Sequence, residues 1–451
     1  MDKILRTAKK FIPTKLFKMA QPAYHYLLAI SGAILYRFPS RKMIVVGVTG
    51  TKGKTSAINF IWSALMAGGL KTGIITTANI RIGDEEVLNK YHMTMPGRFV
   101  IQSYIRKMAN AGCKYCLIET TSEGIKQFRH IGINYDIAVF TNLSPEHLPS
   151  HGGSFENYKN KKLELFKILS KLPRKDIDGK AVEKVMLANT DSEHAKDFLQ
   201  FDADKKITFG IEKSADLIAK NIVEKADGVS FEIGTQKYEI SIPGKFNVYN
   251  ALPAIVIATL AGVNDENIKR GLKKLFVIPG RMEKIEVATL NGGPSGKQKF
   301  TVIVDYAHEK QSMTNVLQTA KIIAGATGKI IVLLGAEGGG RDKTKRADMG
   351  EISAKFADFV VVSNVDPYDD DPKEILESIA TVAEKFGKAR NKNLFVIEDR
   401  REGIKKALSL AKENDVVIIT GKGAEQSMVI KGERIPWDDR EVVREELEKI
   451  S

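Results

Sequence analysis

The stretch MIVVGVTGTKGKTSAINFIWSALMAGG (residues 43–69) carries a strand pattern, a glycine turn and a helix pattern in immediate succession. The apolar run Met43–Val46 predicts a buried strand, and Ser56–Gly69 predicts an amphipathic helix that ends in glycines. Small residues between them allow backbone N–H groups to point at phosphate oxygens, and the N-terminus of the helix favours the same anion. The stretch therefore predicts an α/β fold built around a phosphate-binding loop.

The predicted loop consists of Gly50, Thr51, Lys52, Gly53, Lys54 and Thr55. Lys54 is expected to reach the outer phosphates of a nucleotide, and Thr55 is expected to ligate Mg²⁺. The full Walker A pattern is incomplete, because Val48 stands where that pattern has its first glycine. A glycine turn without a ligand is the alternative, but the placement between a strand and a helix argues against it.

The composition fits a globular protein with a basic surface. A chain of 451 residues favours two or three domains, and its 43% hydrophobic and 27% charged content is ordinary. Two cysteines cannot form a disulfide framework, so a reducing cytoplasm is the expected compartment. The formal net charge is +14, and residues 3–83 contain thirteen Lys or Arg and no Asp or Glu. Anionic substrates or lipids suit this charge, whereas nothing typical of a nucleic-acid-binding module accompanies it, so we expect no nucleic acid partner.

Residues 1–42 form a short basic and apolar segment that we expect to be helical. Basic residues alternate with apolar ones up to Met19, and a more apolar part lies between Pro22 and Pro39. This part is shorter than the about 20 apolar residues that a bilayer span needs, and no clear cleavage site follows it as in a signal peptide. Two interpretations stay open, namely an in-plane contact with anionic lipid headgroups and a helical hairpin packed on the next domain.

From Met43 onward, strand-like and helix-like segments alternate, which predicts a mostly parallel sheet. The segments KTGIITT, KYCLIETT and DIAVFTNLS are typical of buried strands that end in polar residues, where parallel strands carry a site. Between about 205 and 245 a period of two predicts an antiparallel hairpin. We predict three parts: a helical segment over 1–42, a P-loop-type central domain over 43–278, and a Rossmann-like α/β domain over 279–451.

The form TGTxGKT at Thr49–Thr55 resembles the loop of the Mur ligases, the ATP-dependent amide-forming enzymes of cell-wall precursor synthesis, and of folylpolyglutamate synthase. Further segments match this family in order, most closely its MurE type. They are ETTSEGIKQFR (Glu119–Arg129), TNLSPEHLPSHG (Thr141–Gly152), NYKNKKLELF (Asn157–Phe166), GKFNVYNALPA (Gly244–Ala254), PGRME (Pro279–Glu283), DYAH (Asp305–His308), GRDKTKR (Gly340–Arg346), GKGAEQ (Gly421–Gln426) and DDRE (Asp438–Glu441). The resemblance covers about residues 43–451.

The resemblance implies a reaction and its catalytic residues, Lys54, Lys162, His147 and Glu119. In this family ATP phosphorylates a carboxylate to an acyl phosphate, an amine attacks it, and ADP and phosphate leave. Because two anions must approach each other, cations are needed between them. Two Mg²⁺ sites are implied: Thr55 and Glu119 would hold one with the phosphates, and His147 with a carbamylated Lys162 would serve the second. Without the resemblance, Lys162 would be interpreted as a solvated charge and His147 as a loop histidine. Glu119 is a stronger candidate on its own, because a carboxylate that ends a buried strand needs a partner.

The resemblance also implies the nucleotide and substrate contacts. Beside the loop, the nucleotide would meet Asn247, Asn250, Arg281 and Asp305. The acceptor and the amino acid would meet Thr121, Gln127, Arg129, Arg341, Asp366, Tyr368, Gly421 and Glu425. Because Arg281, toward phosphate, and Asp305, toward ribose, belong to the second domain, we expect that domain to close over ATP.

The sequence departs from the family at both substrates. Typical MurE proteins carry an N-terminal domain for the UDP part of the acceptor, and only about 42 residues precede the loop here, so we expect uridine to be held differently or to be absent. Where members that add meso-diaminopimelate have D-N-P-R, this chain has Val365, Asp366, Pro367 and Tyr368. Tyr368 cannot form the bidentate pair of an arginine, and Asp366 would attract an ammonium. These residues favour a basic amino acid such as lysine or ornithine, or a small neutral one. Lys52 replaces an asparagine of the loop and adds positive charge near phosphate.

We therefore predict an ATP-dependent peptide-bond ligase of MurE type that joins a free amino acid to an anionic cell-wall precursor such as UDP-muramoyl-dipeptide. We expect a cytoplasmic monomer, placed at the inner face of the membrane if residues 1–42 contact lipid. The first alternative is a related ligase with a lipid-linked, pseudomurein or folate acceptor, although GRDKTKR and GKGAEQ favour the MurE type over folylpolyglutamate synthase. A non-enzymatic nucleotide-dependent scaffold is disfavoured, because Lys54, Thr55, Glu119, His147, Lys162 and Arg281 are all present.

Overall fold

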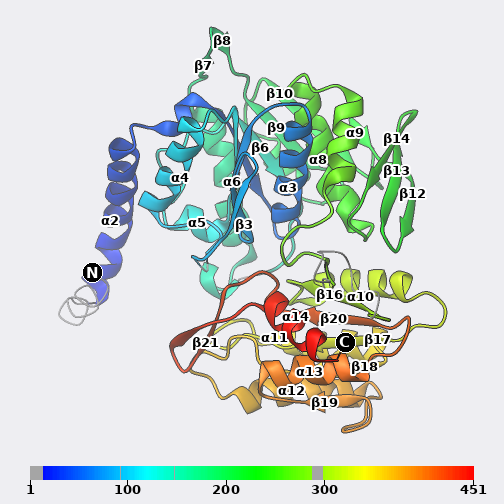
Figure 1. Cartoon of the computed structure of the whole chain (residues 1–451). Helices are drawn as coiled ribbons and strands as arrows, with labels where there is room; N and C mark the ends of the chain where they lie inside the picture. Colours follow the sequence, from blue (N-terminus) through cyan, green and yellow to red (C-terminus); the bar gives the residue numbers. More distant parts are fainter. Residues whose placement is uncertain (1–13, 92, 147, 287–297, 451) are drawn as a thin grey trace.

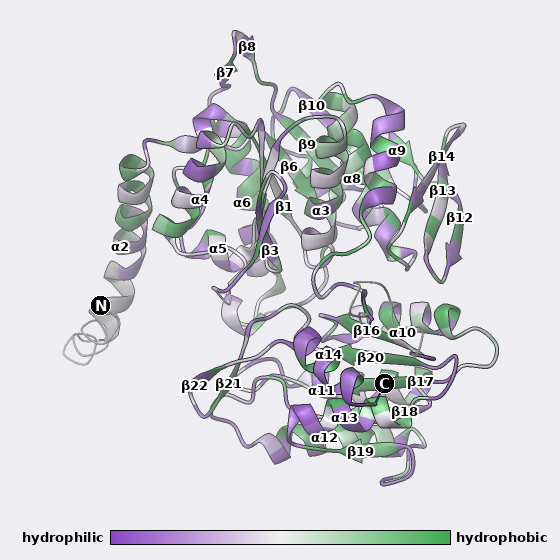
Figure 2. Ribbon diagram, viewed as in Figure 1, coloured by the Kyte–Doolittle hydropathy of each residue, from purple (hydrophilic) through white to green (hydrophobic). Residues whose placement is uncertain are grey.

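The structure, a computed structural model, describes residues 14–91, 93–146, 148–286 and 298–450, and the side chains from residue 21 onward. It consists of two α/β units, one above the other in Figure 1, with a single helix along the side of the first unit. Hydrophobic residues gather on the strands and on the helix faces that cover them, as Figure 2 shows. An α/β fold with mostly parallel sheets was predicted from the sequence and is confirmed.

The first unit is built on a large sheet. Its strands are β1 (Ile44–Thr49), β2 (Thr72–Ile75), β3 (Asn79–Ile82), β4 (Glu85–Leu88), β5 (Tyr115–Glu119), β6 (Ile137–Phe140), β9 (Val185–Asn189), β10 (Lys205–Gly210) and β11 (Leu217–Ile218). They lie in the order β11-β10-β9-β6-β1-β5-β2-β3-β4, and only the pairs β2–β3 and β3–β4 are antiparallel. The strand that precedes the phosphate loop, β1, therefore lies near the middle of a mostly parallel sheet.

Helices cover both faces of this sheet. They are α3 (Lys54–Ala67), α4 (Arg98–Asn110), α5 (Ser122–Lys126), α6 (Phe155–Lys171), α7 (Ala195–Phe198), α8 (Phe246–Leu260) and α9 (Asp265–Lys274), with short 3₁₀ helices η1 (Pro39–Lys42) and η2 (Leu148–His151). Successive residues of β1 point to opposite faces, as the pleat of a strand requires. Val46 and Val48 pack with α3 and α8, whereas Val45 packs with α4 and α6.

The predicted antiparallel hairpin is confirmed, and it belongs to a three-stranded sheet. The strands are β12 (Lys220–Lys225), β13 (Gly228–Ile233) and β14 (Gln236–Ile240), all antiparallel. The hairpin of β13 and β14 was visible as a period of two. The third strand, β12, was missed because its sequence KNIVEK is mostly polar and exposed. A two-residue pair, β7 (Asp176–Ile177) and β8 (Lys180–Ala181), completes the strands of the first unit.

The second unit has a six-stranded sheet. Its strands are β15 (Glu283–Ile285), β16 (Thr301–Asp305), β17 (Ile330–Leu334), β18 (Phe359–Val362), β19 (Leu394–Val396) and β20 (Val416–Thr420), in the order β15-β16-β20-β17-β18-β19. All pairs are parallel except β15–β16. The helices are α10 (Lys310–Ala324), α11 (Thr344–Phe356), α12 (Pro372–Lys385), α13 (Arg400–Leu410) and α14 (Asp439–Ile450), and the strands β21 (Ser427–Ile430) and β22 (Glu433–Pro436) form a separate hairpin.

The N-terminal segment contains a helix, as predicted. In its described part this is one helix, α2 (Thr14–Leu35), followed by η1, and not a hairpin of two helices. It packs against α4, and Figure 1 shows it standing on the side of the first unit. Among the described residues, no helix is both long and apolar enough to cross a membrane.

One large cavity lies between the two sheets. The segments that follow β1, β5 and β6 line it from the first unit, and those that follow β16 and β20 line it from the second. These are carboxyl ends of parallel strands, where ligands of open α/β sheets bind. The fold thus brings residues that are far apart in the sequence to one cavity of about 1130 Å³.

Candidate active site

The loop that joins β1 to α3 has a shape that only its glycines allow. Gly53 lies at φ +81°, and a Cβ atom on it would stand 2.2 Å from Oδ1 of Asn250. Gly50 lies at φ +148°, and its Cβ would stand 2.0 Å from Oγ1 of Thr141. A side chain at either position would meet both an unfavourable backbone conformation and a steric clash. The two glycines therefore hold the loop close to Asn250 on one side and to Thr141 on the other.

Two ammonium groups converge on this loop. Nζ of Lys54 donates to the backbone carbonyls of Gly50 (3.1 Å) and Thr51 (2.9 Å), and Nζ of Lys162, from α6, donates to the same Gly50 carbonyl at 2.6 Å. Lys162 is buried. Burial, reinforced by the neighbouring Lys54, lowers the pKa of Lys162 well below its usual value of 10.5, and burial also lowers the pKa of Lys54. The loop therefore concentrates positive charge where a phosphate group would relieve it.

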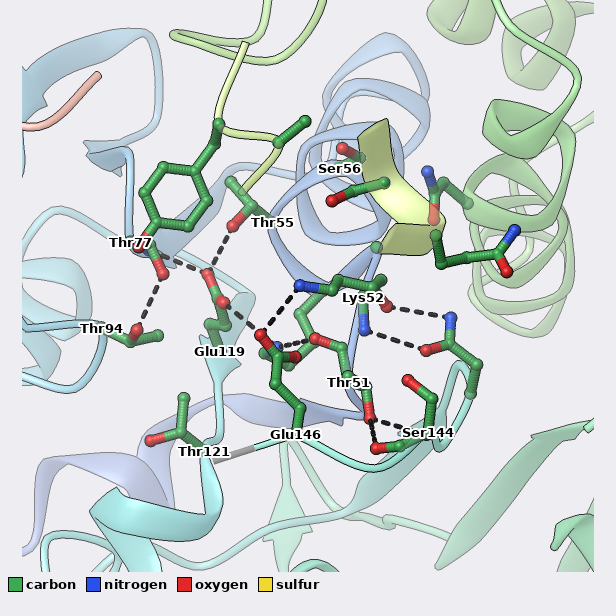
Figure 3. A pocket seen from close by; sticks show the side chains of 18 of the residues that line it. Thr51, Lys52, Thr55, Ser56, Thr77, Thr94, Glu119, Thr121, Ser144 and Glu146 are labelled. Atoms are coloured by element: carbon green, nitrogen blue, oxygen red, sulfur yellow. Dashed lines mark hydrogen bonds and ion pairs between the residues drawn. The ribbon is translucent and has the colours of Figure 1, made fainter. Parts of the chain in front are cut away.

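A carboxylate lies next to these ammonium groups at the carboxyl end of β5. Oε2 of Glu119 accepts hydrogen bonds from Oγ1 of Thr55 (2.7 Å) and from the backbone N–H of Thr77 (2.9 Å), and its Oε1 lies 3.9 Å from Nζ of Lys54. Figure 3 shows Glu119 between Thr55 and Thr77. A hydroxyl and a carboxylate side by side are the oxygen ligands that Mg²⁺ prefers beside nucleotide phosphates. Within the described residues, no group of three or more His, Cys, Asp or Glu could hold a metal by itself.

The two units meet at a second carboxylate, that of Glu146, in what we call the Glu146 cluster (Lys52, Glu146, His308, Glu309 and Lys345). Its Oε1 lies 3.0 Å from Nζ of Lys52, 3.3 Å from Nε2 of His308 and 3.3 Å from Nζ of Lys345. Lys52 also lies 3.4 Å from Oε1 of Glu309. Burial alone would lower the pKa of Lys52, but the carboxylates of Glu146 and Glu309 outweigh it and raise that pKa. Lys52 and Glu146 face each other in Figure 3. The cluster thus joins the loop of the first unit to β16, α10 and α11 of the second.

The predicted nucleotide contacts lie around the same cavity. Nδ2 of Asn250 donates to Oδ1 of Asn247 at 2.9 Å, and both side chains are buried on α8. The guanidinium of Arg281 stacks over the ring of Tyr306, 4.4 Å from its centroid. Asp305 accepts two backbone hydrogen bonds of 2.7 Å, and burial raises its pKa although Arg281 opposes the shift. All five side chains line the cavity, so the residues predicted from both units are brought together.

The predicted acceptor contacts lie at another end of the cavity. Oγ1 of Thr121 accepts the backbone N–H of Gly124 at 3.0 Å and so caps α5. Oε1 of Gln127 accepts a hydrogen bond of 2.6 Å from Nη2 of Arg129. Nε of Arg129 and Oε2 of Glu123 are buried without a hydrogen-bond partner. Burial and the nearby Arg98 lower the pKa of Arg129. A guanidinium with an unused N–H, lining a cavity, has capacity for an anionic group.

Arg341 and Tyr368 lie together at the side of the cavity that the second unit forms. Nε of Arg341 lies 3.4 Å from Oε2 of Glu337, and the nearby Glu337 is the main cause that raises the pKa of Arg341, with a hydrogen bond to Tyr368 contributing. Tyr368 has a φ of +53° and lines an adjoining cavity of about 440 Å³ together with Arg341. These two predicted residues are therefore adjacent and accessible to a ligand.

Asp366 lies elsewhere than the sequence suggested. It is fully buried, its Oδ2 accepts a hydrogen bond of 2.8 Å from Nζ of Lys422, and its Oδ1 accepts the backbone N–H of Val429 at 2.7 Å. Lys422 also donates to Oε2 of Glu425 at 2.6 Å. The ammonium that Asp366 meets is thus that of Lys422 in the same chain. Asp366 and Gly421 line neither cavity, whereas Glu425 lines the large one. Buried and paired with Lys422, Asp366 is not exposed to the ammonium of an incoming amino acid, contrary to the expectation from the sequence.

His147 was predicted, but it lies outside the described residues, so its role has no structural account.

Sequence reasoning passed over three other residues of the site, namely Glu146, His308 and Lys422. Each lies inside a quoted motif: TNLSPEHLPSHG, DYAH and GKGAEQ, respectively. The signal that could have found them is that each is a charged or titratable residue in the loop that follows a buried strand. Their partners, however, lie up to 199 residues away in the chain.

Comparison with known proteins supplies a family. Residues 48–258 match the profile described as the Mur ligase middle domain, and residues 280–423 match the Mur ligase, glutamate ligase domain. A UDP-N-acetylmuramoyl-L-alanyl-D-glutamate--2,6-diaminopimelate ligase from Bacillus cereus is 36% identical over 424 residues, which cover 93% of this chain and 81% of that protein. UDP-N-acetylmuramoyl-L-alanyl-D-glutamate--2,6-diaminopimelate ligase 1 from Clostridium acetobutylicum is 33% identical and covers 94% and 82% of the two chains.

Solved structures give the same picture of the fold. The structure of a UDP-N-acetylmuramoyl-L-alanyl-D-glutamate--2,6-diaminopimelate ligase superposes with a TM-score of 0.58 at 27% identity and covers 90% of this chain and 79% of that one. Folylpolyglutamate synthase of Mycobacterium tuberculosis, in complex with ADP and AMPPCP, superposes with a TM-score of 0.68 at 17% identity and covers 88% and 93%. The latter similarity is one of fold alone.

Proposed function

The chain belongs to the Mur ligase family, with MurE-type ligases among its relatives, and from this premise we propose how its residues join an amino acid to a cell-wall precursor. It is an ATP-dependent ligase. We propose that its acceptor is a muramoyl-peptide carboxylate, as in the relatives, whose names give UDP-N-acetylmuramoyl-L-alanyl-D-glutamate. ATP phosphorylates that carboxylate, the amine of the amino acid attacks the acyl phosphate, and ADP and phosphate leave.

The observation that carries this proposal is the convergence of Lys54 and Lys162 on the carbonyl of Gly50. The two lysine nitrogens lie 3.1 and 2.6 Å from one oxygen, so the side chains repel each other whenever both are charged, and a bound anion would relieve that repulsion. The N-terminus of α3 points into the same place and favours negative charge. We therefore assign the β- and γ-phosphates of ATP to this loop, with Lys54 and Lys52 as cations that stabilise the charge of the transferred phosphoryl group.

The residues around Glu119 fit a magnesium ion. Thr55 and Glu119 already share a hydrogen bond of 2.7 Å, so both oxygens can serve one cation together with phosphate oxygens. Mg²⁺ bound there would neutralise phosphate charge during transfer. We propose a second ion at Lys162, with His147 as a further ligand.

Lys162 would first have to lose its charge. Its lowered pKa favours the neutral amine, whose lone pair attacks CO₂; one proton leaves, and the product is a carbamate anion. The carbamate turns a group that repels a metal into an oxygen ligand. Burial of this lysine therefore supports the proposed modification.

We assign the remaining predicted residues by their positions in the cavity. Asn247, Asn250, Arg281 and Asp305 surround the nucleotide. Thr121, Gln127 and Arg129 hold the anionic acceptor, and Arg341 and Glu425 hold the amino acid. Gly421 and Asp366 act through the loop that carries Glu425, because Asp366 positions Lys422 and Lys422 binds Glu425. We propose the boundaries 43–278 and 279–451 for the two domains that close on ATP.

The amino acid is the finer part of the proposal. Tyr368 offers one hydroxyl where a guanidinium would grip a distal carboxylate, so we propose an amino acid without one, either basic, such as lysine or ornithine, or small and neutral. We further propose that the chain acts as a monomer in the cytoplasm and that residues 1–42 contact a membrane surface. A related acceptor, lipid-linked, pseudomurein or folate, is the alternative.

Phosphate release from ATP tests the reaction. The enzyme is mixed with Mg²⁺, bicarbonate, UDP-muramoyl-dipeptide and each amino acid in turn, with meso-diaminopimelate included. Release that needs both the acceptor and one amino acid, together with a product heavier by that residue, is the expected result. Release that occurs only with meso-diaminopimelate would overturn the amino-acid assignment. No release with any pair, while a lipid-linked or folate acceptor supports it, would overturn the UDP-linked acceptor.

A further inference from the structure

Over residues 21–35, where its side chains are described, the helix α2 presents large apolar side chains outward, which is the reverse of an ordinary surface helix. Its inner face consists of small residues: Ala29, Gly32 and Ala33 are buried against the first unit. A Cβ atom on Gly32 would stand 3.3 Å from the backbone carbonyl of Arg98, so this face permits close packing on α4. The large side chains of this part of the helix are therefore left on its outer side.

The outer face is apolar and uncharged. Leu27, Ile34 and Leu35 are 62%, 58% and 64% exposed, and Tyr24 is exposed beside them. With Ser31 between them, these residues follow a spacing of three, four and seven, which places them on one side of the helix. Of the fifteen large hydrophobic residues that are exposed in the described part of the chain, five lie on α2. Residues 21–35 contain no Asp, Glu, Lys or Arg. An exposed apolar face of this kind marks an interaction surface.

The basic residues that precede and follow residues 21–35 in the sequence indicate the partner. Before residue 21 the sequence carries Lys3, Arg6, Lys9, Lys10, Lys15 and Lys18, and Arg37, Arg41 and Lys42 follow the helix. No acidic residue occurs from residue 3 to residue 83 to neutralise them. An apolar face flanked by cations suits an anionic bilayer surface, where the side chains enter the headgroup region and the cations meet lipid phosphates. The uncharged part of the helix, residues 21–35, extends only about 22 Å along the axis, which is too short to span the hydrocarbon core but sufficient to lie in the plane of the bilayer.

We propose that α2 docks the enzyme in the plane of an anionic bilayer and thereby places the acceptor end of the cavity at the lipid surface. The packing of α2 supports the second part. The ring of Tyr26 meets that of Phe128 edge-on, with centroids 6.3 Å apart, and Ala33 packs against Gly132. The same loop carries Gln127 and Arg129, which line the cavity. Resting on the proposed function, we infer that the enzyme also accepts the muramoyl-peptide when a membrane lipid carries it through a diphosphate.

Arg98 strengthens the link between helix and cavity. It lies on α4, under α2, and its Nη2 donates to the backbone carbonyl of Gln127 at 2.5 Å, while its Nε is buried without a partner. Together with Arg129 it provides two guanidinium groups with unused N–H donors between the docking helix and the cavity. Such donors suit the phosphates of a lipid diphosphate at the bilayer surface.

Sedimentation with vesicles tests the docking without any enzyme assay. The full chain is mixed with vesicles of phosphatidylcholine alone or with added phosphatidylglycerol. We expect the wild type to sediment with the anionic vesicles, less so at high salt, and the variant Leu27→Ser/Ile34→Ser/Leu35→Ser to bind at least about tenfold more weakly. The matched control Val223→Ser/Phe276→Ser/Ile450→Ser removes equally exposed apolar residues elsewhere and should bind like the wild type. Wild type that stays in solution, or a triple variant that binds equally, overturns the proposal.

Two further measurements separate the alternatives. Light scattering that shows a dimer of the wild type and a monomer of the α2 variant, without vesicle binding, would mean that a second copy covers this face and would overturn the proposal. The ligase assay then compares UDP-muramoyl-dipeptide with the same muramoyl-dipeptide on a polyprenyl diphosphate in anionic vesicles. The α2 variant should lose activity about tenfold or more only on the vesicle-borne acceptor. If neither acceptor reacts, the proposed function fails while sedimentation still decides the docking; if only the soluble acceptor reacts, the lipid-linked acceptor is refuted.

Discussion

Replacing Lys422 by methionine should destabilise the second unit strongly, because it leaves a buried carboxylate without its cation. Asp366 and Lys422 are both fully buried, and their charged atoms lie 2.8 Å apart. After the change, Asp366 keeps only the backbone N–H of Val429 at 2.7 Å. Glu425, the other partner of Lys422, retains some exposure and can turn toward water. Removing one member of a buried pair typically costs about 3–5 kcal/mol, which for a unit of this size lowers the melting temperature by roughly 6–20 °C.

The reverse change is expected to cost less. Asp366→Asn keeps an acceptor for Val429, and Lys422 keeps Glu425 at 2.6 Å, so a loss of about 1.5–3 kcal/mol is expected. The double variant Asp366→Asn/Lys422→Met removes both charges and should lie closer to the wild type than Lys422→Met alone. This coupling distinguishes an ion pair from two independent side chains.

Tryptophan fluorescence can follow this unit alone. The chain has two tryptophans, Trp62 on α3 and Trp437 beside β22. In a Trp62→Phe background, used for the reference and all variants, Trp437 reports urea unfolding of the second unit. Losses that simply add in the double variant would refute the pairing. If Asp366→Asn left stability unchanged and raised only the KM for the amino acid, the direct substrate contact first expected for Asp366 would be right after all.

Three other predictions concern the cavity and its surroundings. Lys162→Ala should lower ATP-dependent phosphate release by about 10²–10³-fold, and the mass of the wild type, but not of this variant, should increase by one CO₂ in bicarbonate. Gly53→Ala should weaken ATP binding at least about tenfold, because the Cβ atom of the alanine would stand 2.2 Å from Oδ1 of Asn250. Gly69→Ala is the control, since Gly69 has a similar φ of +79° but a Cβ atom there would have no neighbour within 4 Å. Unchanged ATP binding in Gly69→Ala would show that the clash, and not backbone strain, causes the effect at Gly53. Burial and Lys161 lower the pKa of His130 from 6.5 to about 4, so the unfolded chain takes up a proton first as the pH falls. The free energy of unfolding should therefore be unaffected above pH 6.5 and decrease by up to about 3 kcal/mol between pH 6.5 and 4. Urea unfolding at both pH values should show this loss in the wild type and not in His130→Gln. An equal dependence of the unfolding free energy on pH in the two proteins would contradict the prediction.

The fold was predictable wherever a segment carried its own period. The step from β1 through the glycine turn to α3 is local, so apolar runs and glycines determine it. The hairpin of β13 and β14 was visible for the same reason. β12 was not, because the strand is stabilised by pairing with β13 and not by a buried face of its own. The N-terminal segment left two interpretations open, a lipid contact and a helical hairpin, and the structure adds that its described part is one helix packed on α4.

The site was predictable as far as its motifs reach. Thr55 and Glu119 were expected to share a magnesium ion, and the structure places their oxygens 2.7 Å apart. Partners brought together by tertiary packing were beyond the sequence. The sequence around Asp366 does not indicate that its carboxylate pairs with the ammonium of Lys422, which lies 56 residues further along the chain. The Glu146 cluster likewise depends on the second unit, because Lys345 is 199 residues from Glu146.

The charges of the site form two groups with different roles. Lys54 and Lys162 share a carbonyl and have lowered pKa values, so among the described residues the carboxylates of Glu119 and Glu146 compensate their burial only in part. Lys52 has a raised pKa, because Glu146 and Glu309 hold it. The first pair therefore gains most from a phosphate, or, for Lys162, from a carbamate that reverses its sign. Lys52 instead connects the loop to the second unit through carboxylates already present. Lys52, which the proposed function also assigns to phosphate, thus serves both the contact between the units and the nucleotide, and a phosphate close enough to compete with Glu146 for Lys52 would weaken that contact. Such competition couples the arrival of ATP to the opening and closing of the cavity, since the same ammonium cannot serve both anions fully.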